Sequence, residues 1–253
     1  MIVFNRITIR IGEIYFTEER QPDGPKADLI HFVGILTPRQ EPQWGKSHTL
    51  LIDLSKDPET LLKEMDSGTR YEVRRAQSKD QLTLAVTDSS IPKNVEVFCD
   101  YYDEFAKSKS LRPVFRGRMR ELAQHKNLLL TSASDAHGNI LVQHAHLVMA
   151  ERALLLYSAS GFRQADDSAM RSLVGRANRL LHWQDMMTAM KSRIPLYDMC
   201  GVDVTNRSPE TTRIAQFKQG FGGRVAPSFS RTIAASFKGI AAQAILKLAG
   251  KSF

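Results

Sequence analysis

The order of helix and strand signals in the second half of the chain most constrains its fold. From Pro92 onward, apolar periodicity and turn residues predict the order helix, helix, strand, hairpin, strand, long helix, strand, helix and strand. Asp135 to Asn139 mark the hairpin turn, and the long helix runs from about Ser168 to Lys191. Helices that alternate with strands in this way indicate an α/β protein in which helices flank a sheet.

The first half of the chain carries strand signals and two short helices. The first helix is predicted to begin after a cap at Ser55 or Asp57, with Pro58 in its first turn, and to end at Gly68. The predicted helices lie near residues 58–68, 69–79, 92–108, 117–125, 168–191, 209–219 and 232–248. The predicted strands lie near residues 2–16, 29–36, 49–54, 82–86, 127–132, 140–149, 153–160, 196–199 and 224–229. The polar stretch Thr87 to Lys93 suggests a boundary that divides the chain into residues 1–90 and 91–253.

Composition predicts a cytoplasmic globular protein with a phosphate-rich partner. The 253 residues are 42% hydrophobic and 25% charged, and the sequence shows neither a membrane-span-length apolar run nor a signal peptide. Cys99 and Cys200 lack a metal-binding spacing, so we predict reduced thiols, no metal and no bound cofactor. The net charge of +8 favours nucleic acid, a nucleotide-linked or lipid-linked substrate, or an anionic membrane, although many basic proteins have no such partner.

The stretch from Tyr197 to Gly223 carries the strongest functional signal. It joins an aromatic and acidic strand end to a helix that finishes at Phe217 and Lys218, followed by a glycine-rich turn with Gly220. A lysine fixed at a helix end beside glycines can meet developing negative charge where a ligand approaches the backbone. A simple helix end with a solvated lysine is the alternative interpretation.

Four segments in this order resemble the FemAB-type branch of the GNAT superfamily, the aminoacyl-tRNA-dependent transferases that extend peptidoglycan stem peptides. The segments are Ile52 to Ser55, Arg70 to Ala76, Leu180 to Trp183 with Tyr197, Asp198 and Gly201, and Phe217 to Gly223. The resemblance implies a GNAT-like α/β (α+β) fold, a mixed central sheet flanked by helices, with an abbreviated N-terminal GNAT-like unit in residues 1–90. That shorter first unit leaves the acceptor open among a peptidoglycan precursor, a peptide, a sugar and a nucleoside.

The resemblance also implies roles for individual residues. Lys218 would stabilise the oxyanion or the ribose leaving group, and Phe217 would pack against the terminal adenosine of the donor. Asp198 is the second predicted catalytic residue, because it flanks the loop before the lysine helix and could orient the incoming amine. A cap or a structural partner for Tyr157 or Tyr197 is the alternative. The remaining predicted substrate-binding residues are Arg70, Arg74, Arg75, His146, Tyr157, Asp203, Gly220 and Phe221.

Basic and histidine-containing patterns leave alternatives open. Arg70 and Arg74 share a helix face and suit a phosphate or carboxylate, or they form part of a solvated surface. A second basic stretch contains Arg112, Arg116, Arg118 and Arg120. A solvated surface is favoured there, although a tRNA backbone could track across both stretches. His144 and His146 share one face of a strand, where a hydrogen-bonded core position is favoured over a proton-accepting or metal-binding role.

Two other functions compete with aminoacyl transfer. An acyl-coenzyme-A-dependent transferase would need a glycine-rich turn that binds pyrophosphate at the start of the long helix, whereas the nearest match, Arg171 to Ala177, falls inside the helix. A non-catalytic binding module would use the basic surface and the C-terminal helix. There Ile233, Phe237 and Ile240 lie on one side and Lys238 is polar, which suits either core packing or peripheral contact with a membrane.

Overall fold

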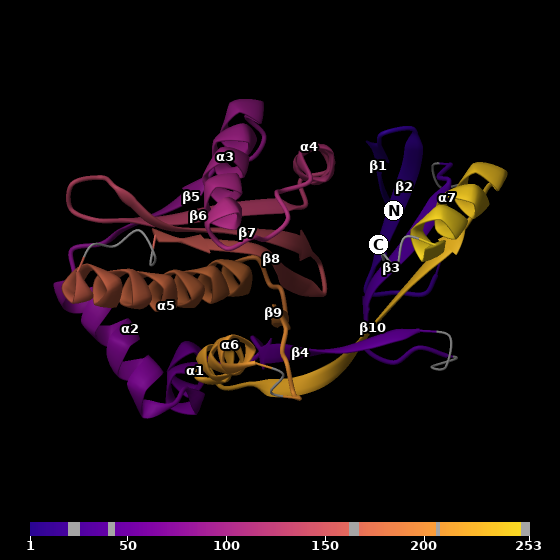
Figure 1. The fold of residues 1–253 in the computed structure, drawn as a ribbon. Coiled ribbons are helices and arrows are strands. Elements are labelled where there is room, and N and C mark those ends of the chain that lie inside the picture. Colours follow the sequence, from indigo (N-terminus) through magenta and orange to yellow (C-terminus); the bar gives the residue numbers. More distant parts are fainter. Residues whose placement is uncertain (20–25, 40–43, 162–166, 206–207, 249–253) are drawn as a thin grey trace.

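One ten-stranded mixed sheet runs through the protein (Figure 1). The computed structural model describes residues 1–19, 26–39, 44–161, 167–205 and 208–248. In this part of the chain the strand order is β1-β2-β3-β10-β4-β9-β8-β7-β6-β5. The strands are β1 (Ile2–Arg6), β2 (Ile9–Tyr15), β3 (Leu29–Ile35), β4 (Gly45–Asp53), β5 (Thr83–Thr87), β6 (Leu128–Ser134), β7 (Ile140–Met149), β8 (Arg152–Ser160), β9 (Leu196–Gly201) and β10 (Arg224–Ala234).

Seven helices in the described residues accompany the sheet. They are α1 (Pro58–Glu64), α2 (Ser67–Lys79), α3 (Pro92–Ser108), α4 (Arg116–Gln124), α5 (Ser168–Lys191), α6 (Pro209–Gln219) and α7 (Phe237–Leu248). Helix α5 packs on β6, β7 and β8 with α2 beside it, and α3 and α4 lie across the opposite face (Figure 1). The predicted mixed sheet flanked by helices is therefore confirmed.

Strand pairing brings the two ends of the chain together. β10, the last strand, lies between β3 and β4 and is antiparallel to both. β9 is antiparallel to β4 and parallel to β8, so it connects the early strands to the β5–β8 meander. The predicted division of the chain near residue 90 stays a prediction, while the strand order shows that residues from both ranges meet at β9 and β10.

Apolar residues form a large cluster on each side of this sheet. One includes Phe4 of β1, Phe98 of α3 and Leu147 of β7, and its position shows that the first strands curl toward α3 and α4. The other includes Leu61 of α1 and Phe221 after α6. Burial of these apolar groups is the main force that holds the layers together. The described helices are too short or too polar to cross a bilayer.

Two predicted helix boundaries are wrong. Gly68 does not end the first helix, because α1 stops at Glu64 and the side chain of Asp66 accepts the Thr69 amide to begin α2. The C-terminal helix does not begin at Thr232, because that residue still belongs to β10 and pairs with His31 of β3. Local sequence favoured a longer helix in both places. The Asp66 cap sets the boundary between α1 and α2, and strand pairing of β10 sets the start of α7.

Candidate active site

Lys218 lies in the last turn of α6 and reaches the end of β9. Ser208 begins this helix by accepting the Thr211 amide, and Pro209 occupies its first turn. The Lys218 Nζ donates a hydrogen bond of 2.7 Å to the Gly201 carbonyl oxygen. Burial lowers the pKa of the Lys218 ammonium, while nearby Cys200 and Asp198 act in the opposite direction. The ammonium is therefore held at a defined place with two further N–H groups to offer.

The strands β8 and β9 part beside this lysine. Their parallel pairing covers only Ala153 with Tyr197 and Leu154 with Asp198, although β8 continues to Ser160 and β9 to Gly201. Strand edges that separate in this way present backbone N–H and C=O groups that a peptide-like ligand can pair with. Lys218 thus binds the part of β9 that no longer pairs with β8.

Asp198 anchors the same end of β9 from inside the protein. It is 1% exposed, and its carboxylate accepts hydrogen bonds from Thr49 Oγ1, from the Cys200 amide at 2.8 Å and from Arg152 Nη1 at 3.3 Å. Burial raises the pKa of Asp198, and the bonds from Thr49, Cys200 and Arg152 partly offset this rise. The carboxylate therefore ties β4, β8 and β9 together where the strands part.

The backbone turns sharply directly after Asp198. Cys200 has a φ of 60°, a left-handed conformation that is uncommon for residues other than glycine. The Asp198 carboxylate holds the Cys200 amide in this bend, and the next residue is the Gly201 that binds Lys218. Residues held in such conformations concentrate at functional sites, where the surrounding structure maintains them.

Arg152 completes the buried anchor. Its Nη1 also donates to the Gly34 carbonyl oxygen at 3.0 Å, and its guanidinium lies 4.1 Å from the centre of the Phe16 ring. Gly34 belongs to β3, which is separated from β8 in the strand order by β10, β4 and β9. Arg152 therefore bridges the curl of the sheet, a contact that no local pattern in the sequence indicates.

Aromatic rings connect the lysine helix to α5. Phe217 and Phe221 pack against each other with ring centres 5.5 Å apart, and both contact the His182 ring. The Arg179 guanidinium lies 4.8 Å from the centre of the half-buried Phe217 ring. Phe221 is buried in the core. The structure thus brings Phe217, Phe221 and Lys218 together, while their contacts with a substrate stay predictions.

A buried polar cluster lies beneath these rings. His144 Nδ1 is 2.7 Å from Asp185 Oδ2, and the Tyr197 hydroxyl is 3.0 Å from His146 Nε2 and 2.8 Å from His182 Nδ1. The predicted shared face of His144 and His146 is confirmed. The two histidines and Asp185 offer metal-ligand atoms within 4.8 Å of one another, but the Asp185 oxygen already lies within hydrogen-bonding distance of His144. His146 Nδ1 and Asp185 Oδ1 are buried without a hydrogen-bond partner among the described residues, so the cluster is only partly satisfied.

This cluster predicts an acid-sensitive fold. Burial lowers the pKa of His146 to about 4 and also lowers the pKa of His182 well below its ordinary value of 6.5. The unfolded chain therefore binds more protons than the folded one between about pH 6.5 and pH 4, so stability present above pH 6.5 falls as the pH falls. Each such histidine contributes a slope approaching about 1.4 kcal/mol per pH unit in that window.

Chemical denaturation of the protein and of a His146→Gln variant, measured at a series of pH values, tests this expectation. Glutamine keeps a polar group near the Tyr197 hydroxyl and cannot titrate, so the variant should show a shallower loss of stability below pH 6.5. Identical slopes for the two proteins would contradict the proposed titration of His146.

The glycine-rich turn after α6 packs against the chain itself. Gly222 and Gly223 have φ values of 80° and 78°, which glycine adopts without strain. A Cβ at Gly222 would lie 2.8 Å from the Glu64 carbonyl oxygen, and one at Gly220 would overlap the side chains of Asp66 and Thr69. These glycines therefore let the turn dock on α1 and α2. The predicted ligand contact of Gly220 stays a prediction.

The arginines of α2 have different surroundings. Arg70 Nη1 donates to the Lys63 carbonyl oxygen at 3.2 Å, so Arg70 binds the C-terminal end of α1. Arg74 and Arg75 are exposed on the same helix. Their proposed contact with a phosphate stays a prediction, and Arg70 would have to leave its carbonyl partner to take part.

The other predicted site residues have structural partners of their own. Tyr157 packs against Tyr102 of α3, with ring centres 4.7 Å apart, on the face of the sheet opposite α5. Asp203 closes a turn by accepting the Thr205 amide at 2.9 Å. In the second basic stretch, Arg116 pairs with Glu96, Asp100 and Asp103, Arg118 with Glu13, and Arg120 with Glu96. Carboxylates thus neutralise three of these four arginines.

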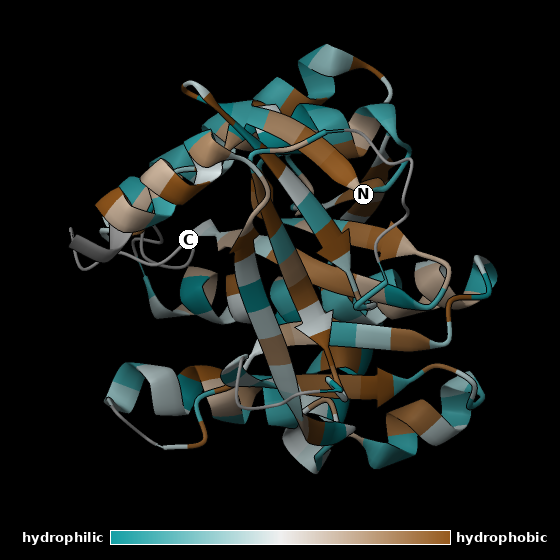
Figure 2. Cartoon of the chain, turned by 90° about the vertical axis from the view of Figure 1, so that its right-hand side faces the viewer, coloured by the Kyte–Doolittle hydropathy of each residue, from teal (hydrophilic) through white to brown (hydrophobic). Residues whose placement is uncertain are grey.

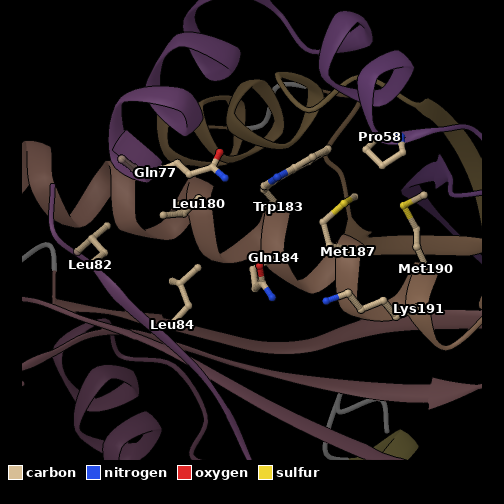
Figure 3. A pocket seen from close by; sticks show the side chains of 11 residues that line it. Pro58, Gln77, Leu82, Leu84, Leu180, Trp183, Gln184, Met187, Met190 and Lys191 are labelled. Carbon is tan, nitrogen blue, oxygen red and sulfur yellow. The ribbon is translucent and has the colours of Figure 1, made fainter. Parts of the chain in front are cut away.

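A cavity of about 660 Å³ lies on another side of α5 (Figure 3). Trp183, Met187 and Met190 project from α5 toward Pro58 of α1, and Leu84 of β5 lines the far side. Glutamine side chains and a lysine from α2 and α5 also line it, so its chemistry suits an apolar group with a polar end. The lining does not include Lys218.

Neither a protein family model nor a curated protein matches the sequence. Solved structures do share the fold. FemX is 12% identical, with 88% of this chain and 74% of that chain covered and a TM-score of 0.61. L-PGS from Bacillus licheniformis is 10% identical, with 88% and 74% covered and a TM-score of 0.54.

The C-terminal domain of a putative lysylphosphatidylglycerol synthetase from Agrobacterium fabrum is also similar. It is 12% identical, with 86% of this chain and 72% of that chain covered and a TM-score of 0.53. At such low identity these likenesses establish the fold alone. They confirm the predicted GNAT-like fold, and the assignment to the Fem-type branch stays a prediction.

Proposed function

We propose that this protein transfers an aminoacyl group from aminoacyl-tRNA to an amine and so forms an amide bond. The position of Lys218 carries the proposal: its ammonium is held on Gly201 at the place where β8 and β9 separate. An acyl transferase needs a cation or N–H group beside the reacting carbonyl, and a surface that aligns the acyl donor with the acceptor. The fold shared with FemX supports the same assignment.

In the proposed reaction, the acceptor nitrogen attacks the ester carbonyl carbon of the charged tRNA. A C–N bond forms, the ester C–O bond breaks, and the terminal ribose oxygen leaves as a hydroxyl group. The amine gives up one proton and the ribose oxygen gains one. The Lys218 ammonium stabilises the negative charge that develops on the carbonyl or ribose oxygen, and its lowered pKa makes it a better proton donor to the leaving oxygen.

Neighbouring residues would position the reactants. Phe217 is half-buried beside the lysine and offers a ring face to the terminal adenosine. Asp198 was predicted to orient the amine. Its bonds to Thr49, Cys200 and Arg152 support an indirect role, in which it maintains the bend that presents Gly201 to Lys218.

One feature of α5 favours tRNA over an acyl-coenzyme A donor. The helix begins at Ser168, and the Asp167 carboxylate accepts the Met170 amide at 2.7 Å. A pyrophosphate at this helix end would meet that negative charge and a backbone N–H that is already occupied. Arg171 to Ala177, the nearest match to a coenzyme A turn, lies within the helix. An acyl-coenzyme A or carrier-protein thioester therefore has less support as the donor.

The acceptor is proposed as a class only. An amine on a peptidoglycan precursor, a peptide, a sugar or a nucleoside fits the reaction. Since aminoacyl-tRNA is a cytoplasmic compound, the proposal places the activity in the cytoplasm. The remaining basic surface, including Arg74 and Arg75, would contact the tRNA backbone.

Transfer of labelled amino acids tests the proposal. The purified protein is incubated with radiolabelled aminoacyl-tRNAs or, separately, with labelled acetyl-coenzyme A, each with a cell extract freed of nucleic acid. We expect label from charged tRNA to enter small amine-bearing molecules in a Lys218-dependent manner. Label from acetyl-coenzyme A alone would identify an ordinary acyltransferase, and label from neither donor would favour a binding module.

A further inference from the structure

Helix α7 presents its apolar side to solvent. Phe237, Ile240 and Ile245 are 92%, 57% and 65% exposed, and Ala241 and Ala244 are exposed between them. Positions three, four, seven and eight residues apart fall on one face of a helix. In an ordinary surface helix that face is buried, whereas here its large side chains are exposed. The helix itself lies at the edge of the molecule, beside β10 and β2 and away from α5 and α6 (Figures 1 and 2).

The inner side of α7 is small and polar. Gly239 packs so closely that a Cβ there would overlap the Asp28 carbonyl oxygen. Ser236 caps the helix by accepting the Gly239 amide at 3.1 Å, and Gln243 Nε2 donates to the Thr232 carbonyl oxygen at 2.8 Å. The helix is thus held by its backbone and polar groups. The exposed side chains of Phe237, Ile240 and Ile245 remain available for another surface.

A second exposed apolar residue lies at the same end of the sheet. Ile7, in the turn between β1 and β2, is 95% exposed. The Asp28 carboxylate accepts the Arg10 amide at 2.9 Å and the Ser236 hydroxyl at 2.6 Å, and so joins the β1–β2 hairpin to the start of α7. Ile7 and Phe237 therefore project from neighbouring elements.

The charge around this surface is positive. Arg10 and Lys238 are exposed near Asp28. Hydrogen bonds from the Arg10 amide and the Ser236 hydroxyl lower the pKa of Asp28 most, and the charges of Lys238 and Arg10 lower it further. No Asp or Glu follows Glu210 in the sequence, whereas lysines and arginines continue to the end. Exposed apolar residues beside cations, without a matching number of acids, fit the interface of a membrane with anionic lipids.

We propose that α7 and the β1–β2 turn dock the protein on an anionic phospholipid bilayer. Phe237, Ile240 and Ile245 enter the boundary between head groups and acyl chains, with Ile7 as a second insertion point. Arg10 and Lys238 contact lipid phosphates. This docking surface does not depend on the proposed transferase reaction, because none of its residues belongs to the candidate active site.

Vesicle flotation with the full-length protein tests the docking surface. We expect binding to vesicles of mixed phosphatidylglycerol and phosphatidylcholine, and little binding to phosphatidylcholine alone. Phe237→Ser should weaken the binding about tenfold or more, because a large exposed apolar group no longer enters the interface. Lys238→Gln should weaken it about fivefold and reduce its dependence on salt.

A matched control is Val97→Ser, a change at an exposed apolar residue of α3. It should leave vesicle binding unchanged. Because Phe237 is exposed, its replacement should also leave the thermal unfolding curve unchanged, so a loss of binding would report the surface itself. Equal binding to neutral vesicles, or no binding to anionic ones, would overturn the proposal. A change in oligomeric state caused by Phe237→Ser without a change in vesicle binding would overturn it as well, and would indicate a second copy as the occupant.

Discussion

Replacing Lys218 with methionine is expected to reduce the turnover of aminoacyl transfer about a hundredfold and to leave the protein folded. Methionine keeps the length and the apolar stem of the side chain but removes the ammonium that the reaction needs beside the developing oxyanion. The lost bond goes to the carbonyl of Gly201, which is itself exposed, so water can replace the lysine as its donor. Single-turnover transfer from charged tRNA, together with a thermal unfolding curve, measures both expectations.

Lys107→Met provides the matched control. Lys107 also lies in the last turn of its helix and is exposed, but it belongs to α3, on the face of the sheet opposite α5. It should retain full turnover. A folded Lys218→Met protein with undiminished turnover would reject Lys218 as the catalytic cation. A variant that had merely lost tRNA affinity would recover its rate at saturating donor, whereas loss of transition-state stabilisation persists at saturation.

Much of the fold could be predicted because local signals marked the ends of its helices. The predicted bounds of α3, α5 and α6 agree with the structure, and α3 and α6 have proline in their first turn. Such signals act within a few residues, so the sequence reveals them directly. The start of α7 was placed too early because β10 pairs with β3, and those residues are about two hundred positions apart. Long-range pairing of this kind overrides local helix preference.

In the candidate site too, local features could be predicted and long-range contacts could not. The lysine at the helix end and the glycines after it could be recognised from spacing alone. The residues that hold β9 in place could not, because Thr49 and Arg152 reach Asp198 from distant parts of the sequence. Arg179, which covers the Phe217 ring, was missed for the same reason. Arginine at these positions resembles any other surface arginine until the fold is known.

Breaking the buried pair of Arg152 and Asp198 is expected to cost about 3 to 5 kcal/mol of folding free energy. Asp198→Asn preserves the size of the side chain and an acceptor for Thr49, but leaves the Arg152 guanidinium buried without a counter-charge. Arg152→Met leaves the Asp198 carboxylate buried without a counter-charge. Burial lowers the pKa of Arg152 and raises that of Asp198, which shows that each charge is disfavoured there and depends on the other.

The double variant Arg152→Met with Asp198→Asn should be more stable than the sum of the two single changes predicts, because it leaves neither charge alone. Urea denaturation of the four proteins measures this coupling. Single losses below about 1 kcal/mol, or strictly additive losses, would contradict a coupled buried pair.

A second double variant, Arg152→Met with Asp198→Leu, separates a structural from a positioning role for the pair, because leucine has a similar size but no oxygen to accept the Cys200 amide. If the pair only stabilises the fold, turnover should recover along with stability. If it maintains the bend at Cys200 that presents Gly201 to Lys218, turnover at saturating donor should stay low in a well-folded double variant. We expect the second outcome, because the Asp198 carboxylate accepts the Cys200 amide directly and the left-handed conformation there needs a partner to maintain it.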